Sequence, residues 1–199
     1  MARKTFFSFA YVRDAWRAGQ VRNSNVIASE DEYGFIDAVD WEAIKRQGAD
    51  AIKRWVKEQL KDTSVTAVLI GNETADREWV RFELVESWNR GNGIVGIWIH
   101  DILDRDRKAD AQGRNPFELF TLPNGTRLSA VCKTYNWVSD DGRTNLGKWL
   151  EEAVEIRSQY GADDTISEAT EKQAPVVIQS SARGFAPRSP WCADGRGER

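Results

Sequence analysis

The sequence is poor in the residues that build metal centres, disulfide frameworks and histidine-based catalytic sites. Its 199 residues include one histidine, His100, and two cysteines, Cys132 and Cys192. One histidine cannot supply a multi-histidine zinc site and leaves little room for a histidine-based triad. Two cysteines, which we expect in a strand and in a C-terminal tail, make neither a disulfide framework nor a metal-ligand cluster. We therefore expect no bound metal and a reducing, cytoplasmic setting.

Long hydrophobic runs, strong net charge and phosphate-binding glycine patterns are also missing. The sequence contains no stretch of roughly 18 apolar residues, so no membrane span is expected. The net charge is −3, from 28 basic and 31 acidic side chains, which argues against binding to nucleic acid through bulk electrostatics. Gly71-Asn72-Glu73 lacks the glycine spacing of dinucleotide- and triphosphate-binding loops. Nucleic acid and membranes are therefore not among the expected partners.

Between residue 4 and about residue 158 the sequence alternates apolar segments with amphipathic ones. The runs Val65–Ile70 and Ile94–Ile99 are uninterrupted and rich in β-branched residues, which is typical of central strands in a parallel sheet. Shorter strands are expected over residues 4–10, 33–38 and 128–134, and helices over residues 13–26, 44–60, 77–90 and 145–160. This alternation predicts a doubly wound α/β fold.

The composition changes after Gly161. The remaining residues are rich in serine, alanine, glycine and arginine, hold three of the five prolines and show no sustained period. Such a composition is typical of segments that do not pack into a domain. We therefore predict one domain over residues 1–160 and a disordered tail over residues 161–199.

The position of a glutamate on the helix after the third strand makes it a candidate catalytic group. Asp76 is a plausible N-cap for this helix, on which Val80, Leu84 and Trp88 recur every four residues and form a core-facing stripe. Glu83 lies four residues after Trp79 and borders this stripe. A carboxylate held beside an indole near a strand-to-helix crevice favours a perturbed pKa and a functional role. The alternative is a boundary glutamate that pairs with an arginine.

Doubly wound sheets bind ligands beyond the carboxyl ends of their strands, where the strand order reverses. If the order is flavodoxin-like, the ends of the first and third strands flank this crevice. Ala10-Tyr11 and Gly71-Asn72 would then line its rim, with the helix of Glu83 beside it. The topology and the candidate carboxylate therefore predict the same place for a site.

Several segments of the chain resemble TIR domains, especially the bacterial TIR-like group of Thoeris antiphage defence. The segments that carry the resemblance are Phe6–Phe9, Thr63–Thr66, Trp79–Leu84, Gly91–Ile97 and Tyr135–Gly142. The resemblance covers roughly residues 3–158. It implies a flavodoxin-like TIR fold with five parallel strands and an enzyme that cleaves NAD, its substrate, at the nicotinamide–ribose bond without a bound cofactor. In the Thoeris type the implied product is a cyclic ADP-ribose isomer that activates a partner effector upon phage infection.

The resemblance also suggests which residues form the site. Glu83 matches the catalytic glutamate of the family through its place in the tryptophan-containing helix motif. The family pocket corresponds to the first-strand positions Phe6, Ser8 and Tyr11, and the segment with Arg22 and Asn23 often lies near it. Many NAD-consuming TIR domains carry a longer loop after the first strand than this chain does.

The implied chemistry suits a site with one carboxylate and no histidine. Cleavage of the nicotinamide–ribose bond passes through an oxocarbenium-like state, which a carboxylate near the ribose stabilises. Nicotinamide departs as a neutral base, so no general acid is obligatory. Attack by water gives ADP-ribose, whereas a cyclic product requires that water is excluded and the adenine folds back. Tyr11, Trp41 and Trp79 are the candidate stacking residues, and the sequence leaves open whether the enzyme is a cyclase or a hydrolase.

Two other functions are compatible with the same pattern. One is a non-catalytic TIR-like interaction module, and self-assembly is a further expectation for this class. The other is a flavodoxin-like binding domain without a cofactor. The surroundings of Glu83 discriminate between the enzyme and these alternatives. A carboxylate in a pocket with aromatic walls favours catalysis, whereas an exposed or salt-bridged carboxylate favours scaffolding.

Overall fold

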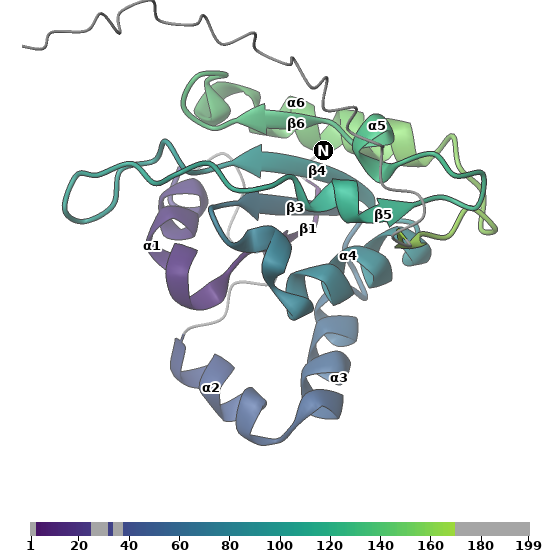
Figure 1. Ribbon diagram of the computed structural model, residues 1–199, viewed down its shortest axis with the longest axis horizontal. Helices are drawn as coiled ribbons and strands as arrows, with labels where there is room; N and C mark the ends of the chain where they lie inside the picture. Colours follow the sequence, from purple (N-terminus) through teal and green to yellow (C-terminus); the bar gives the residue numbers. More distant parts are fainter. Residues whose placement is uncertain (1–2, 25–31, 34–37, 170–199) are drawn as a thin grey trace, which may run out of the picture.

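The computed structural model describes residues 3–24, 32–33 and 38–169, with the backbone alone for residues 32–33 and 38–41. Five parallel strands form the central sheet in the order β2-β1-β3-β4-β6 (Figure 1). The strands are β1 Thr5–Ser8, β2 Glu32–Tyr33, β3 Val65–Ile70, β4 Gly93–Trp98 and β6 Thr134–Asn136. This is the flavodoxin-like order. The predicted doubly wound α/β fold, with a parallel five-stranded sheet and flanking helices, is therefore confirmed.

Helices cover both faces of the sheet. The helices are α1 Tyr11–Arg22, α2 Ala38–Arg46, α3 Ala49–Gln59, α4 Glu78–Arg90, α5 Leu128–Val131 and α6 Gly142–Arg157. Side chains of α1 and α6 pack with Phe7 of β1 and Leu69 of β3 into one core cluster. Side chains of α4 pack with Val68 and Ile70 on the other face. Because successive strand residues point to opposite faces, each buried strand contributes side chains to the core on both faces of the sheet.

The strand predicted over residues 128–134 is wrong. Leu128–Val131 forms the short helix α5, and only Thr134–Asn136 pairs with β4. Leu128 and Cys132 lie four residues apart and both enter the core cluster beside α4, as expected of one helical turn. Cys132 therefore caps α5 instead of lying in a strand.

The single helix predicted over residues 44–60 is also wrong. The chain forms α2 and α3 with a break at Gly48, whose φ of 93° is incompatible with a continuous α-helix. Asp76 does not cap the helix of Glu83, because it lies in the 3₁₀ turn η2 Thr74–Asp76 and Arg77 holds the N-cap position. A second 3₁₀ turn, η3 Pro116–Leu119, lies in the segment between β4 and β5 (Phe120–Thr121).

Part of the segment that we assigned to the tail packs against the fold. β7 Ser167–Glu168 pairs antiparallel with β5 Phe120–Thr121. Ile166 is buried among side chains of the α4 layer, and the indole N–H of Trp88 donates a hydrogen bond of 2.6 Å to the carbonyl of Asp164. Residues 170–199 lie outside the described residues.

Replacing Gly93 with alanine should destabilise the protein, because α6 crosses β4 closely at this residue. A Cβ on Gly93 would lie 2.5 Å from the carbonyl carbon of Ala153 and 2.6 Å from the amide nitrogen of Val154. Neither backbone atom can move without shifting α6, so we expect a loss of about 1–3 kcal/mol in the free energy of unfolding. Urea denaturation measures this loss. Gly147→Ala is the control, since a Cβ on Gly147 of α6 meets nothing within 4 Å and should stabilise the helix slightly.

Candidate active site

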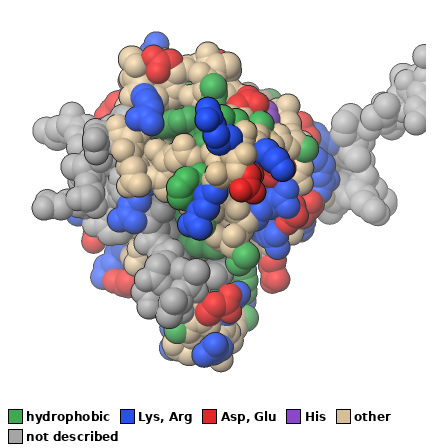
Figure 2. Space-filling model, turned by 90° about the vertical axis from the view of Figure 1, so that its left-hand side faces the viewer, with side chains coloured by type: hydrophobic (Ala, Val, Ile, Leu, Met, Phe, Trp, Pro, Cys, Tyr) green, Lys and Arg blue, Asp and Glu red, His purple; other side chains and the backbone are tan. Residues whose placement is uncertain are grey.

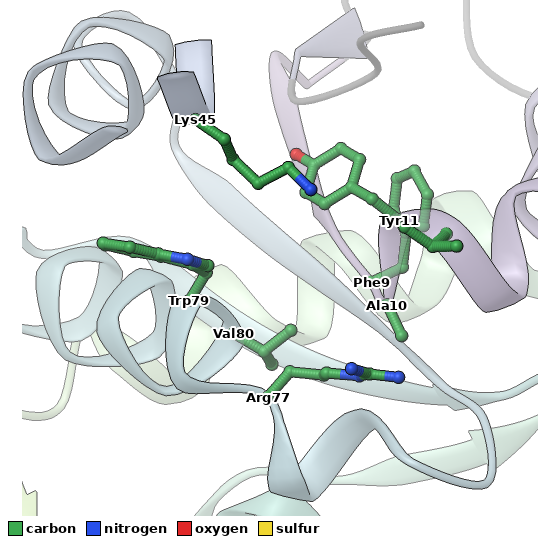
Figure 3. A pocket seen from close by; sticks show the side chains of 8 residues that line it. Phe9, Ala10, Tyr11, Lys45, Arg77, Trp79 and Val80 are labelled. Carbon is green, nitrogen blue, oxygen red and sulfur yellow. The ribbon is translucent and has the colours of Figure 1, made fainter. Parts of the chain in front are cut away.

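A cleft opens where β1 ends and α1 begins. It contains about 500 Å³ of empty space, part of which is open to solvent. Its walls come from the carboxyl end of β1, the first turn of α1, the end of α2 and the start of α4 (Figure 3). The lining residues are Phe9, Ala10, Tyr11, Val12, Lys45, Arg77, Trp79 and Val80. The cleft therefore lies at the carboxyl edge of the sheet, where parallel α/β folds bind ligands.

Only half of the predicted rim lines this cleft. Ala10 and Tyr11 line it. Gly71 instead packs against the carboxylate of Asp14, so closely that a Cβ on Gly71 would lie 2.3 Å from Asp14 Oδ2. Asn72 donates a side-chain hydrogen bond of 3.2 Å to the carbonyl of Ala111. The loop after β4 thus occupies the edge beyond β3, and the cleft lies on the β1 side.

Glu83 lies behind the wall of the cleft and is more deeply buried than its position beside the hydrophobic stripe predicts. Its side chain points from α4 toward β1 and is 0% exposed. Glu83 Oε2 accepts a hydrogen bond of 2.5 Å from Ser8 Oγ, whereas Oε1 is buried with no hydrogen-bond partner among the described residues. The nearby arginines bind elsewhere, since Arg81 donates to the carbonyl of Ala75 and Arg77 pairs with Glu73. The alternative of an arginine-paired boundary glutamate therefore does not describe this side chain.

The surroundings of Glu83 disfavour its charged form. Burial raises the pKa of the Glu83 carboxyl from 4.5 to about 8, and the hydrogen bond from Ser8 acts in the opposite direction. The phenol of Tyr11 is affected in turn, because burial and the nearby Glu83 carboxylate raise its pKa well above 10. A carboxyl group with a pKa near neutrality beside a cleft is a functional-site candidate.

Aromatic side chains form much of the wall of the cleft. The ring of Tyr11 packs at 4.5 Å from that of Phe9 and edge-on at 6.4 Å from that of Trp55. Trp79 lies one helical turn before Glu83 and meets Phe82 edge-on at 6.2 Å. In Figure 3, Tyr11 and Trp79 border the cleft from α1 and α4, and the amine of Lys45 reaches in from α2. Such walls offer flat apolar surfaces on which a planar ring can stack.

The structure brings some of the predicted site residues together and leaves others apart. Ser8 and Glu83 bond to each other, and Tyr11 and Trp79 line the cleft. Phe6 is buried in the core beneath α3 and does not line the cleft.

Arg22 and Asn23 lie at the opposite end of α1 from Tyr11, roughly 16 Å along the helix. The structure does not bring these two residues to the cleft. The side chain of Trp41 lies outside the described residues.

Sequence reasoning missed two cations of the cleft, Lys45 and Arg77. Nothing in the local sequence distinguishes Lys45 from the other charged residues of its helix. Arg77 could have been identified by position, because it caps the helix of Trp79 at the carboxyl edge of β3. Residues at that edge are the ones that meet ligands in parallel sheets.

A second buried carboxylate, Asp14, lies outside the cleft. Both of its oxygens lack a hydrogen-bond partner among the described residues, and Arg17 Nη1 lies 3.9 Å from Oδ1. Burial raises the pKa of Asp14 to about 6, against the opposing charges of Arg17 and Arg13. Arg13 forms ion pairs of 2.9 Å with both Glu73 and Asp110. α1 and the loop after β4 thus meet through opposite charges, and the side of the molecule where α1 lies shows acidic and basic side chains intermixed (Figure 2).

The two buried carboxyl groups predict that the protein loses stability as pH rises. Glu83 and Asp14 have higher pKa values in the folded state than their ordinary values of 4.5 and 3.8. The folded state therefore binds more protons than the unfolded state, and the free energy of unfolding falls with rising pH. The loss extends from about pH 4 to about 6 for Asp14 and to about 8 for Glu83, approaching about 1.4 kcal/mol per pH unit for each group. Urea denaturation from pH 5 to 8.5 measures this loss. In Glu83→Gln the free energy of unfolding should change little between about pH 6 and about pH 8.

The described residues provide no metal site and no membrane span. No group of three or more histidine, cysteine, aspartate or glutamate side chains in this part of the chain could hold a metal ion. None of its helices is both long and apolar enough to cross a membrane.

Comparison with known proteins supplies two matches. The family model of the TIR-like domain of the Thoeris protein ThsB matches residues 6–104, a range that includes Ser8, Tyr11, Trp79 and Glu83. The chain is also 32% identical over 192 aligned residues to ThsB1 of Bacillus cereus (strain MSX-D12), whose name assigns it provisionally as a cyclic ADP-D-ribose synthase. That alignment covers 75% of this chain and 100% of the relative.

Proposed function

The chain belongs to the Thoeris ThsB family of TIR-like proteins, and from this premise we propose that it cleaves NAD at the nicotinamide–ribose bond with Glu83 as the catalytic carboxylate. The proposed product is a cyclic ADP-ribose-type signal that activates a partner effector in defence against phage. The provisional assignment of the Bacillus cereus relative as a cyclic ADP-D-ribose synthase supports this product.

The observation that carries the proposal is the buried carboxylate of Glu83 beside the cleft. Leaving a buried acceptor without a hydrogen bond costs roughly 1–3 kcal/mol, and Glu83 Oε1 is such an acceptor among the described residues. An interaction module gains nothing from a buried acceptor that lacks a hydrogen bond. In an enzyme, a ribose hydroxyl or the positive charge that develops on the ribose can interact with this acceptor when the substrate is bound.

The chemistry follows from the groups at the site. As the nicotinamide–ribose bond breaks, its electron pair leaves with nicotinamide, and positive charge develops at the anomeric carbon and ring oxygen of the ribose. Ionised Glu83 stabilises that charge in a region from which water is excluded, where the attraction is stronger than in bulk water. Nicotinamide leaves as a neutral molecule, which is consistent with a cleft whose lining residues include no histidine.

NAD can meet Glu83 only after part of the wall has moved. The carboxylate is fully buried and is not among the residues that line the cleft, whereas its neighbours on α4, Trp79 and Val80, are. Once the dinucleotide has entered, the same aromatic surfaces can hold the adenine folded toward the ribose and keep water away. Both conditions favour attack by a group of the substrate itself over attack by water, which is why we propose a cyclic product.

Incubation of the purified protein with NAD tests the proposal, with and without lysate of phage-infected cells. Chromatography and mass spectrometry identify the products. We expect release of nicotinamide together with a cyclised ADP-ribose, and neither in Glu83→Gln. Linear ADP-ribose as the sole product would instead establish a hydrolase. Absence of turnover even with infected lysate would favour the interaction module.

Substitution of Lys45 or Arg77, the cations among the described lining residues, should weaken NAD binding. Lys45 and Arg77 border the cleft (Figure 3), and the pyrophosphate of NAD is the anionic group that they would meet. Both are partly exposed and already pair with Glu42 and Glu73, so their net contribution is modest. We expect Lys45→Ala and Arg77→Ala each to raise KM about three- to tenfold with a smaller change in kcat.

Initial rates over a range of NAD concentrations measure these effects. Lys61→Ala is the control, because Lys61 is exposed, pairs with Glu58 at 3.7 Å and lies away from the cleft residues. Unchanged KM in both cleft variants would contradict the assigned position of the pyrophosphate.

A further inference from the structure

Building on the proposed function, we propose that Ser8 is a positioning residue of the reaction. By donating to Oε2, it holds the Glu83 carboxylate so that Oε1 is the oxygen that meets the ribose. Ser8 would thus act through Glu83 and not by contact with NAD.

The sheet fixes the hydroxyl of Ser8 in space. Ser8 is the last residue of β1, is 0% exposed, and lies in register with Val68 of β3. β1 pairs with β3 along its whole length, including Ser8, and with β2 at Thr5 and Phe6, so the strand that carries Ser8 is anchored in the interior of the sheet. Successive strand residues alternate in direction, and Phe7 packs with the α1 and α6 layer while Ser8 Oγ reaches α4.

The hydrogen-bonding capacity of the two side chains determines which oxygen is available. A serine hydroxyl has one proton to donate, and Ser8 donates it to Glu83 Oε2 at 2.5 Å. Oε1 has no partner among the described residues. A glutamate side chain rotates about three bonds, so without this contact the carboxylate would sample several orientations. Hydrogen bonds to ionised groups are short and about twice as strong as neutral ones, which suits the contact to positioning an ionised catalytic group.

A second buried hydroxyl contact between the sheet and α4 provides a matched control. Thr66 Oγ1 of β3 donates to Ser87 Oγ at 2.8 Å, and both residues are buried. Ser87 lies one helical turn after Glu83 and makes no hydrogen bond to it. Ser87→Ala therefore removes a comparable contact between sheet and helix without touching the carboxylate.

The test compares the wild type with Ser8→Ala, Ser8→Thr and Ser87→Ala in NAD turnover across pH 5.5–9. We expect Ser8→Ala to lower kcat about 10- to 100-fold with KM within about threefold of the wild type. Turnover should rise with pH as Glu83 ionises. In Ser8→Ala this rise should occur at higher pH than in the wild type, because the Ser8 hydroxyl lowers the pKa of the Glu83 carboxyl. Ser8→Thr keeps a hydroxyl, so its turnover should rise at the same pH as that of the wild type. Ser87→Ala should keep both the kcat of the wild type and the pH at which turnover rises.

Two results would overturn the proposal. Equal losses of kcat in Ser8→Ala and Ser87→Ala, with no change in the pH at which turnover rises, would mean that the contact is only structural. A raised KM with unchanged kcat would mean that Ser8 binds the substrate directly.

A readout without turnover separates this proposal from the proposed function. In Ser8→Ala the pH range over which urea stability falls should extend to higher pH, whether or not the protein cleaves NAD. If the wild type does not cleave NAD and Ser8→Ala shows this shift in the pH dependence of stability, the proposed function is overturned and the hydrogen bond between Ser8 and Glu83 is supported. If the wild type cleaves NAD and Ser8→Ala shows no shift, the positioning role alone is overturned.

Discussion

Replacing Glu83 with glutamine should abolish NAD cleavage and leave the protein folded. Glutamine has nearly the size of glutamate and can still accept the hydrogen bond from Ser8. It carries no charge, so it cannot stabilise the positive ribose of the transition state. Loss of one preorganised electrostatic partner typically costs about 10²- to 10³-fold in kcat. We expect at least this loss here, with a small change in KM because the interaction strengthens only as the bond breaks.

Stability measurements separate this effect from misfolding. Burial disfavours the charged form of Glu83, so the glutamine variant should be as stable as the wild type at pH 5 and more stable at pH 8. Glu86→Gln is the control, since Glu86 lies on the same helix and pairs with Lys57 at 3.4 Å on the surface. That variant should retain full turnover. Activity like that of the wild type in Glu83→Gln would remove Glu83 from the mechanism.

The central strands could be predicted from the sequence because burial on both faces leaves an uninterrupted apolar run. The run Val65–Ile70 coincides with β3, and the run Ile94–Ile99 is shifted by one residue from β4. The segment over residues 128–134 shows why shorter runs fail. Leu128 and Cys132 meet the core from one helical turn, whereas only Thr134–Asn136 reaches the edge of β4. A short apolar segment fits either conformation, and tertiary pairing decides between them.

The site was predictable as a location but not as a set of contacts. Topology and the helix motif placed Tyr11, Trp79 and Glu83 at one edge of the sheet, and they lie there. The bond between Ser8 and Glu83 joins residues 75 positions apart, and its length depends on how α4 packs on β1. Lys45 lines the cleft from α2, a helix that the break at Gly48 separates from α3. Local periodicity contains no information on either arrangement.

Replacing Trp88 with alanine should produce the largest loss of stability of any substitution proposed for this chain. Trp88 is 0% exposed at the centre of the α4 layer. Its ring meets Tyr160 edge-on at 5.4 Å and lies beneath the guanidinium of Arg157 at 4.8 Å. Its N–H donates to the carbonyl of Asp164, and its own carbonyl accepts two hydrogen bonds from Arg157. Truncation of such a side chain costs about 3–5 kcal/mol.

The loss should have a local signature as well as a global one. Trp88 connects α4, which carries Glu83, to the end of α6 and the chain beyond it, because its ring and N–H contact Tyr160 and Asp164. Urea denaturation measures the global loss, and limited proteolysis should detect cleavage near residues 158–169 earlier than in the wild type. Trp88→Phe keeps an aromatic ring but loses the N–H donor, so it should show the same early cleavage with a smaller loss of stability.

Trp16→Ala is the matched control, since Trp16 is 45% exposed on α1 and contacts Arg105 at the surface. It should change the free energy of unfolding by less than about 1 kcal/mol. Equal losses in Trp16→Ala and Trp88→Ala would contradict the central place of Trp88. An unchanged cleavage pattern in both Trp88 variants would show that the chain beyond α6 is held by other contacts, such as the pairing of β7 with β5.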